Sequence, residues 1–288
     1  GQLSSVAQDG LTASYQYNAL GLPIQVQWQN GASESLQYSS QGEAMEHQLL
    51  FPGRGNLEAE TVERRDGLGR KAELRFVTPA AERRHTYSYD LLGRLTGSSR
   101  HYQPNGGQAA SLSYQYDGAD NRLRRGGEVS QFNPADQLTR VVGAPTQPTY
   151  SNTGSMQRDP NDVRFTYDWR DQLKTVQSPG QQLSFQNNAF NLRMEKVVNS
   201  QHTRFLWDGG QVLKEYFGPG YPGQLGQVRA SYFLGATGRE AIKVGGQWYL
   251  YVRDTHGSMT GLVDLDGNRV ATYENNDYGE VLVDEGSV

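Results

Sequence analysis

The chain has 288 residues, of which 35% are hydrophobic and 10% aromatic, and its formal net charge at pH 7 is −4. The aliphatic content is low for a thick globular core, while 17 tyrosines are too many for a disordered chain. The chain has no excess of basic residues, which gives no support for a nucleic-acid partner. It contains no cysteine, so it has neither disulfides nor thiolate metal sites. No apolar run is long enough for a membrane-spanning helix.

A short phrase recurs along the chain, and its most complete copy lies at residues 87–96. Tyr87 and Tyr89 alternate, so an extended strand places both rings on one face. Asp90 can accept backbone N–H groups of the following residues and so start a turn. Gly93 supplies the positive φ of a hairpin turn, and Leu95 begins the returning strand. The phrase therefore predicts a β-hairpin.

Looser copies of the phrase follow one another at intervals of roughly 16 to 27 residues, which is the period range of repeat architectures. In chain order, the predicted anchor residues are Tyr17, Gly21, Tyr38, Gly42, Asp66, Gly69, Tyr89, Asp90, Gly93, Tyr116, Asp117, Tyr150, Gly154, Tyr167, Asp168, Trp207 and Asp208. This series predicts an all-β array of hairpins over residues 1–230. In three copies Asp stands at the glycine position, which leaves a different turn type open there.

The character of the chain changes at Ser231, after which strands richer in aromatic rings are expected. Residues 231–288 are predicted to continue the same sheet as a second region. This region contains the segment Arg253–Asp264 and, further on, the segment Tyr273–Glu280.

Asp254, His256 and Ser258 alternate within the second region, which prompts a test for a catalytic triad. Successive members of a triad must be hydrogen-bonded directly. Residues two apart on a strand have Cα atoms about 6.6 Å apart, which is a poor distance for side chains as short as Asp and Ser. Gly257 also favours a turn, so the segment is interpreted as a structural, hydrogen-bonded turn. We therefore predict no catalytic residue, no cofactor and no metal ligand, and we do not expect an enzyme.

The repeated phrase resembles the YD repeat of the Rhs family, which is named after its Tyr-Asp pair, and the resemblance covers nearly the whole chain. The second region resembles the Rhs-associated core signature of that family. The residues that carry this second resemblance are Asp254, His256, Gly257, Ser258, Tyr278 and Gly279. Two departures are Thr255-His256 in place of Asp-His-Leu, and Asn276-Asp277 in place of an Asp-Pro pair. The Asp-Pro-x-Gly motif with which some family members cut themselves does not occur.

The resemblance implies a β-hairpin ribbon that curls into a spiral and forms part of a hollow shell. In the family, such a shell encloses a C-terminal toxin domain and is delivered by a secretion apparatus or as part of a toxin complex. It also implies a bacterial protein that is cytoplasmic before export and secreted or delivered to a cell surface afterwards. The expected partners are further repeats and a C-terminal effector of the same polypeptide, with a cleavage or plug segment between them.

A second interpretation remains open. Animal relatives of the family act in adhesion, so the chain could instead be an extended cell-surface module that binds glycans or another protein. Exposed tyrosine, tryptophan and arginine side chains would serve that purpose.

Overall fold

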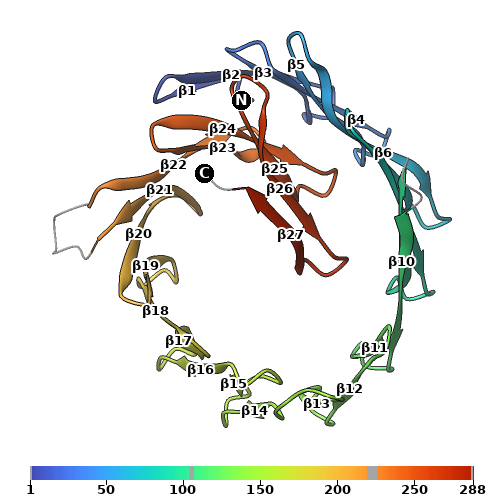
Figure 1. The fold of residues 1–288 in the computed structure, drawn as a ribbon, viewed down its shortest axis with the longest axis vertical. Coiled ribbons are helices and arrows are strands. Elements are labelled where there is room, and N and C mark those ends of the chain that lie inside the picture. The colour runs from blue at the N-terminus through green and yellow to red at the C-terminus, as the bar shows by residue number, and fades with distance from the viewer. Residues whose placement is uncertain (1, 104–106, 219–225, 287) are drawn as a thin grey trace. The chain divides into compact units, whose positions relative to one another are not determined.

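The computed structural model describes residues 2–103, 107–218, 226–286 and 288, and every regular element in these ranges is a β-strand (Figure 1). The first sheet contains β1 (Ser5–Gln8), β2 (Leu11–Tyr17), β3 (Pro23–Trp28), β4 (Ser33–Tyr38), β5 (Ala44–Phe51), β6 (Gly55–Arg65), β7 (Lys71–Val77), β8 (Glu82–Tyr89), β9 (Leu95–Gln103), β10 (Gly107–Tyr116), β11 (Arg122–Arg125), β12 (Glu128–Phe132) and β13 (Leu138–Val141).

The second sheet contains β14 (Thr149–Tyr150), β15 (Met156–Arg158), β16 (Arg164–Tyr167), β17 (Leu173–Ser178), β18 (Gln181–Asn187), β19 (Arg193–Val198), β20 (Gln201–Asp208), β21 (Gln211–Phe217), β22 (Val228–Gly235), β23 (Gly238–Val244), β24 (Gln247–Arg253), β25 (Met259–Asp264), β26 (Arg269–Asn275) and β27 (Val281–Gly286). In both sheets the spatial order of the strands is their order in the chain, so each sheet is a meander of hairpins. The all-β fold predicted from the sequence is confirmed. In the described ranges, no helix is long and apolar enough to span a membrane.

The turn at Asp90 shows why the repeated phrase forms hairpins. The Asp90 N–H donates to the Arg94 carbonyl at 3.0 Å, and the Gly93 N–H donates to the Asp90 carbonyl at 3.1 Å. The Asp90 carboxylate accepts the N–H groups of Leu92 and Arg94 at 3.0 and 2.9 Å. Gly93 has a φ of +87°, which glycine adopts without a steric penalty. The turn predicted from Asp90 and Gly93 is confirmed.

The same backbone pattern recurs along both sheets, with a short polar residue first and a positive φ at the fourth position. It starts at Asn18, Ser39, Asp66, Asp90, Asp117, Asn133, Ser151, Asp159, Asp168, Asn188, Asp254, Asp264 and Asn276. Where Asp replaces Gly the turn does not change, because Asp120, Asp136 and Asp171 have φ values of +68°, +57° and +56°. Asp tolerates the left-handed region better than most residues. The different turn type left open for these copies is therefore wrong.

We expect Gly93→Val to lower the free energy of unfolding by roughly 1–3 kcal/mol, because valine is strained at a φ of +87°. Gly67→Val is the matched control, since Gly67 lies in the preceding turn of this kind without a positive φ and has open space where a Cβ would lie. Urea denaturation of the two variants measures the difference. Equal losses would contradict the role of the fourth turn position.

The chain divides into two compact units, which we describe separately. Unit 1 comprises Gly1–Ser111 and Ala230–Val288, and unit 2 comprises Leu112–Arg229. The cut before Ala230 lies next to the boundary expected after residue 230, whereas the cut within β10 has no counterpart among the expected boundaries.

Unit 2 contains β11–β13 of the first sheet and β14–β21 of the second, and it buries few hydrophobic side chains. In its described residues the buried hydrophobic side chains are Tyr114, Val212 and Tyr216, while most other apolar side chains are half-buried. Such sheets depend on hydrogen bonds and cross-strand pairs more than on a thick core.

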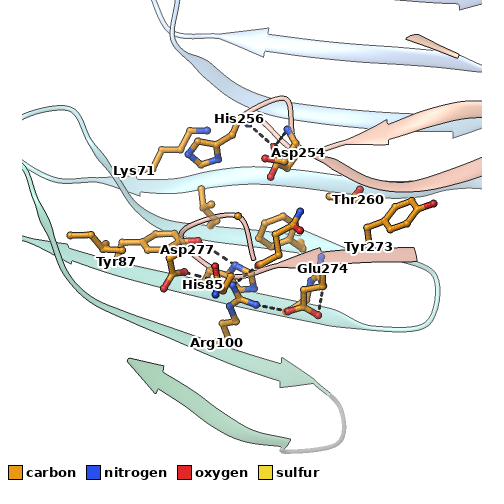
Figure 2. Close-up of a pocket in the computed structure, with 18 of the residues that line it drawn as sticks. Lys71, His85, Tyr87, Arg100, Asp254, His256, Thr260, Tyr273, Glu274 and Asp277 are labelled. Carbon is orange, nitrogen blue, oxygen red and sulfur yellow. Dashed lines mark hydrogen bonds and ion pairs between the residues drawn. The ribbon is translucent and has the colours of Figure 1, made fainter. Parts of the chain in front are cut away.

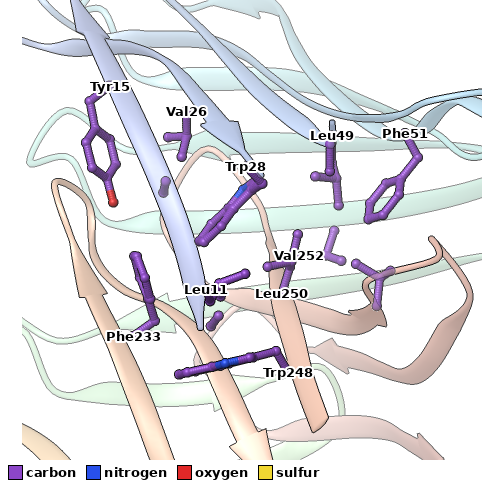
Figure 3. Packing of buried hydrophobic residues seen from close by; sticks show 14 residues of the cluster. Leu11, Tyr15, Val26, Trp28, Leu49, Phe51, Phe233, Trp248, Leu250 and Val252 are labelled. Atoms are coloured by element: carbon purple, nitrogen blue, oxygen red, sulfur yellow. The ribbon is translucent and has the colours of Figure 1, made fainter. Parts of the chain in front are cut away.

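Unit 1 has a dry core between strands that are far apart in sequence. Side chains of β2, β3 and β5 pack against side chains of β22–β25 (Figure 3). Trp28 lies at the centre, with its ring 5.3 Å from that of Phe233, which in turn lies 6.1 Å from Trp248. Trp28 and Phe233 are 1% and 0% exposed. This core brings the second region of the sequence against the first hairpins of the chain.

Candidate functional site: the signature turns and their polar pocket

The aromatic anchors of the repeat fasten each hairpin to the preceding one. The Tyr89 hydroxyl donates to the carbonyl of Lys71, the first residue of β7, at 2.9 Å. Equivalent bonds link Tyr17 to Leu3, Tyr38 to Pro23, Tyr150 to Leu138, Tyr167 to Met156 and Trp207 to Arg193. The anchors therefore link neighbouring hairpins through hydrogen bonds from an aromatic side chain to a backbone carbonyl.

Tyr116 is half-buried like Tyr89 and Tyr167, as equivalent packing positions require. Asp208 does not begin the repeated turn, because it pairs with Gln211 across a two-residue turn formed by Gly209 and Gly210.

We expect Tyr89→Phe and Tyr167→Phe to cost similar amounts, about 0.5–1.5 kcal/mol each, because each removes one hydroxyl bond to a backbone carbonyl. Thermal or urea denaturation measures the loss. A change in only one of the two variants would show that the two tyrosines are not equivalent.

The residues of the core signature form two copies of the same turn. Asp254 starts the turn between β24 and β25, and its Oδ1 accepts the N–H groups of His256 and Ser258 at 2.9 and 2.8 Å. Gly257 has a φ of +84°. The hydrogen-bonded turn predicted here is confirmed, and one Asp254 oxygen is occupied by the backbone.

Asn276 starts the second signature turn, between β26 and β27. Its side-chain oxygen accepts the N–H groups of Tyr278 and Glu280 at 2.9 and 3.0 Å, and Gly279 has a φ of +81°.

The two signature turns line one pocket of about 390 Å³ in unit 1 (Figure 2). Asp254, His256 and Ser258 come from the first turn, and Asp277 and Gly279 come from the second. The opposite wall comes from β7, β8 and β9, with the polar side chains Lys71, Arg83, His85, Tyr87, Tyr89 and Arg100. The structure thus unites four of the six predicted signature residues, while Gly257 and Tyr278 are not among the lining residues and Tyr278 is 44% exposed.

Arg100 fastens the second signature turn to β9. Its guanidinium lies 2.7 Å from Glu274 and donates to the Asn275 carbonyl at 2.7 Å. Glu274 also accepts the Tyr102 hydroxyl at 2.8 Å, and Ser98 donates to Asp277. Since Arg100 is only 8% exposed, these bonds are shielded from solvent.

Glu60 fastens the first signature turn to β6. Its carboxylate accepts the N–H and the hydroxyl of Thr255 at 2.5 and 2.7 Å, and the Lys71 ammonium donates to the same hydroxyl at 2.7 Å. Glu60 is 2% exposed, and burial raises its pKa above the ordinary value. Burial lowers the pKa of Lys71.

His85 is a buried titratable group on the pocket wall. Burial, together with the charges of Arg100 and Arg83, lowers the pKa of His85 to about 3. Its Nδ1 lies 3.4 Å from the Tyr87 hydroxyl, and within the described chain its Nε2 has no hydrogen-bond partner. The ring is therefore neutral at physiological pH.

We expect His85 to show no protonation above pH 5 in histidine NMR spectra of the folded chain. Because its folded pKa lies below the unfolded value of 6.5, its contribution to stability is present above pH 6.5 and is lost as the pH falls towards 3. His85→Gln identifies the resonance. A His85 midpoint near 6.5 would contradict its burial.

The charged side chains of this pocket hold strands and turns together through hydrogen bonds and ion pairs. Its buried charges are engaged with other strands, and in the part of the chain that the structure describes no three His, Cys, Asp or Glu residues are placed to hold a metal ion. Sequence reasoning missed Glu60, Lys71, Arg100 and Glu274 as partners of the signature turns. Glu60, Lys71 and Arg100 lie more than 170 residues from the signature residues that they contact, so no local pattern could have revealed them. Glu274 is close to the second turn in sequence, but its partner Arg100 is 174 residues away.

Comparison with known proteins shows what the chain is similar to. No family model matches it. It is 26% identical over 190 residues to the tRNA3(Ser)-specific nuclease WapA of Bacillus spizizenii, an alignment that covers 61% of this chain and 8% of the relative. The crystal structures of TcdB2-TccC3-TEV and TcdB2-TccC3 each match 95% of the chain with a TM-score of 0.61 and 14% identity, and the match covers 16% of each solved chain.

These matches establish the fold. The chain shares the fold of the TcdB2-TccC3 structures over nearly its whole length, which supports the Rhs-like fold implied by the resemblance. It spans only a small part of each relative.

Proposed function

We propose that the chain is a wall segment of an Rhs-type shell that encloses an effector carried on the same polypeptide. The observation that carries the proposal is the fold that the chain shares with the TcdB2-TccC3 structures over 95% of its length. In this proposal the anchor residues set the repeat of the wall, and the wall keeps the effector apart from its surroundings until delivery.

The organisation of the sheets supports this role. The same turn recurs along the chain, and an aromatic side chain links neighbouring hairpins by a hydrogen bond. Each sheet therefore grows by one strand after another, without crossovers. The described part of unit 2 buries few hydrophobic side chains, as expected for a wall one sheet thick. The pocket of unit 1 uses its charged groups to fasten strands, which supports the proposal that the segment itself is not an enzyme.

The similarity to a protein named as a tRNA nuclease supports a polypeptide that carries a bacterial effector. We propose export by a secretion apparatus or as part of a toxin complex, with the effector held inactive in the cytoplasm beforehand. The identity of the relative's effector is not transferred to this chain, because the alignment covers 8% of that protein.

Limited proteolysis of the natural full-length polypeptide tests the proposal. We expect residues beyond the wall to resist protease in the intact protein and to be digested rapidly when they are expressed alone. A Trp28→Ala variant, which removes the central side chain of the core in unit 1, should weaken the protection. Leu91→Ala is the matched control because Leu91 is 96% exposed. Equal digestion in the intact protein and in isolation would refute enclosure.

A binding module is the second candidate, and exposed aromatic turn tips favour it. Trp169 and Phe190 are 91% and 83% exposed, and the Arg170 guanidinium lies 5.5 Å from the centre of the Trp169 ring. A glycan array probed with the 288-residue chain would detect such binding. Saturable binding that is lost in Trp169→Ala and Phe190→Ala variants would favour recognition over enclosure.

A further inference from the structure

His47 of β5 lies between two hydrogen-bond acceptors. Its Nδ1 is 2.7 Å from the carbonyl oxygen of Arg253 at the end of β24, and its Nε2 is 3.2 Å from Oε2 of Glu34 on β4. A carbonyl oxygen only accepts, so Nδ1 must carry a proton. An ionised carboxylate also only accepts, so a second proton must lie between Nε2 and Oε2. The pair therefore holds two protons, whereas a neutral imidazole and an ionised carboxylate together hold one.

The pair is buried at the contact between the first hairpins and the second region. His47 and Glu34 are 6% and 5% exposed, and the other Glu34 oxygen accepts the Trp28 indole N–H at 3.3 Å. Trp28 is itself part of the dry core of unit 1 (Figure 3). The protonated pair thus joins three strands at the edge of that core.

The charged groups around the pair favour retention of the proton. Glu60 of β6 lies directly across from His47 in the sheet, and Glu58 lies on the same strand. Glu240 and Tyr15, which are bonded to each other at 2.7 Å, interact with Glu34. Positive groups also lie nearby: the Arg253 guanidinium donates to the Thr237 carbonyl at 3.2 Å, the Arg269 guanidinium pairs with Glu58, and the charge of Lys71 interacts with Glu60.

These surroundings determine whether the pKa of His47 is raised or lowered. Burial by itself would lower it, but the hydrogen bond and charge of Glu34, the Arg253 carbonyl and the charge of Glu58 raise it above the ordinary value. Because protons in such a close pair are shared, the raised value belongs to the pair.

We propose that the His47–Glu34 pair is a pH-dependent latch, which holds the end of β24 against β4 and β5 while it is protonated and weakens when the proton is lost. After deprotonation, a nitrogen lone pair and a carboxylate face each other in a buried site, which is unfavourable. The proposal concerns contacts within unit 1 and holds whatever the wall encloses.

The raised pKa of His47 determines whether the stabilisation is lost at high or at low pH. A raised folded pKa means that the stabilisation is fully present below the unfolded value of about 6.5 and is lost as the pH rises through the folded value. Glu60 and Glu240, whose pKa values burial raises, act in the same direction. His85, Lys71 and His256, which lies in the turn between β24 and β25, have pKa values that burial lowers and act in the opposite direction, so a local measurement is needed.

Histidine NMR of the 288-residue chain tests the protonation state. The His47 resonances are identified by their loss in His47→Gln. We expect both ring nitrogens of His47 to be protonated at pH 7 and the midpoint to lie above 6.5. A bare ring nitrogen together with an ionised Glu34 carboxylate at pH 7 would overturn the proposal. If Glu34→Gln folds, the midpoint should fall in that variant, and an unchanged midpoint would also count against the latch.

Amide hydrogen exchange tests the mechanical consequence. Between pH 6 and 9, after correction for intrinsic exchange rates, protection in the β24–β25 hairpin should fall roughly tenfold or more, as expected for the loss of a charge-assisted hydrogen bond. Protection in β11–β13 of unit 2 should be unchanged. His47→Gln should abolish the pH dependence, whereas His101→Gln, a change at an exposed position, should preserve it. The same pH dependence in wild type and His47→Gln would refute the latch.

Discussion

Replacing Trp28 by alanine is expected to lower the free energy of unfolding of unit 1 by about 3–5 kcal/mol, the range for truncating a large aromatic side chain in a core. Trp28 is 1% exposed and packs on Phe233, while its indole N–H donates to Glu34. The substitution therefore leaves a cavity between strands about 200 residues apart and removes one bond from a buried carboxylate.

Urea denaturation monitored by the fluorescence of the remaining tryptophans, of which the chain has four in all, would measure this loss. Trp169→Ala is the matched control, because Trp169 is 91% exposed and its removal should change stability by less than about 0.5 kcal/mol. Comparable effects of the two substitutions would show that the first hairpins and the second region do not share a core.

Replacing Arg269 by methionine is expected to cost about 3 kcal/mol, because it leaves Glu58 as a buried charge without its partner. Arg269 of β26 pairs with Glu58 of β6, whose side chain is 6% exposed. The remaining polar contact of Glu58 in the described structure is the Thr260 hydroxyl at 2.7 Å. One hydroxyl does not replace the charge of a guanidinium.

The double variant Arg269→Met with Glu58→Gln separates the loss of the charge from the loss of packing. We expect it to be more stable than Arg269→Met alone, since the glutamine carries no charge. Arg64→Met is the exposed control: its ion pair with Glu73 spans 3.5 Å with the arginine 58% exposed, so it should cost less than about 1 kcal/mol. A double variant that is no more stable than the single one would contradict a charge penalty at Glu58.

The sequence by itself determined the repeated hairpin, because the turn needs only residues that are close in the chain. An Asp, Asn or Ser at the first position supplies the side-chain oxygen, and Gly, Asn or Asp at the fourth tolerates a positive φ. The alternation around Tyr89 and Tyr167 likewise marks the anchored strands. Even the turn starting at Asp254 was accessible, since its bonds span no more than four residues.

The tertiary structure alone decided which strands meet across unit 1. Glu60 and Thr255 are 195 residues apart, and His47 and Arg253 are 206 apart, so no local pattern links them. The sequence shows a glutamate within a strand, but not whether that face is exposed or covered. Glu34, Glu58 and Glu60 are buried because the second region lies over their strands, and burial in turn requires each of them to have a partner. The polar pocket and the latch therefore arise from long-range packing, since charges at these positions would be ordinary surface residues without the covering strands.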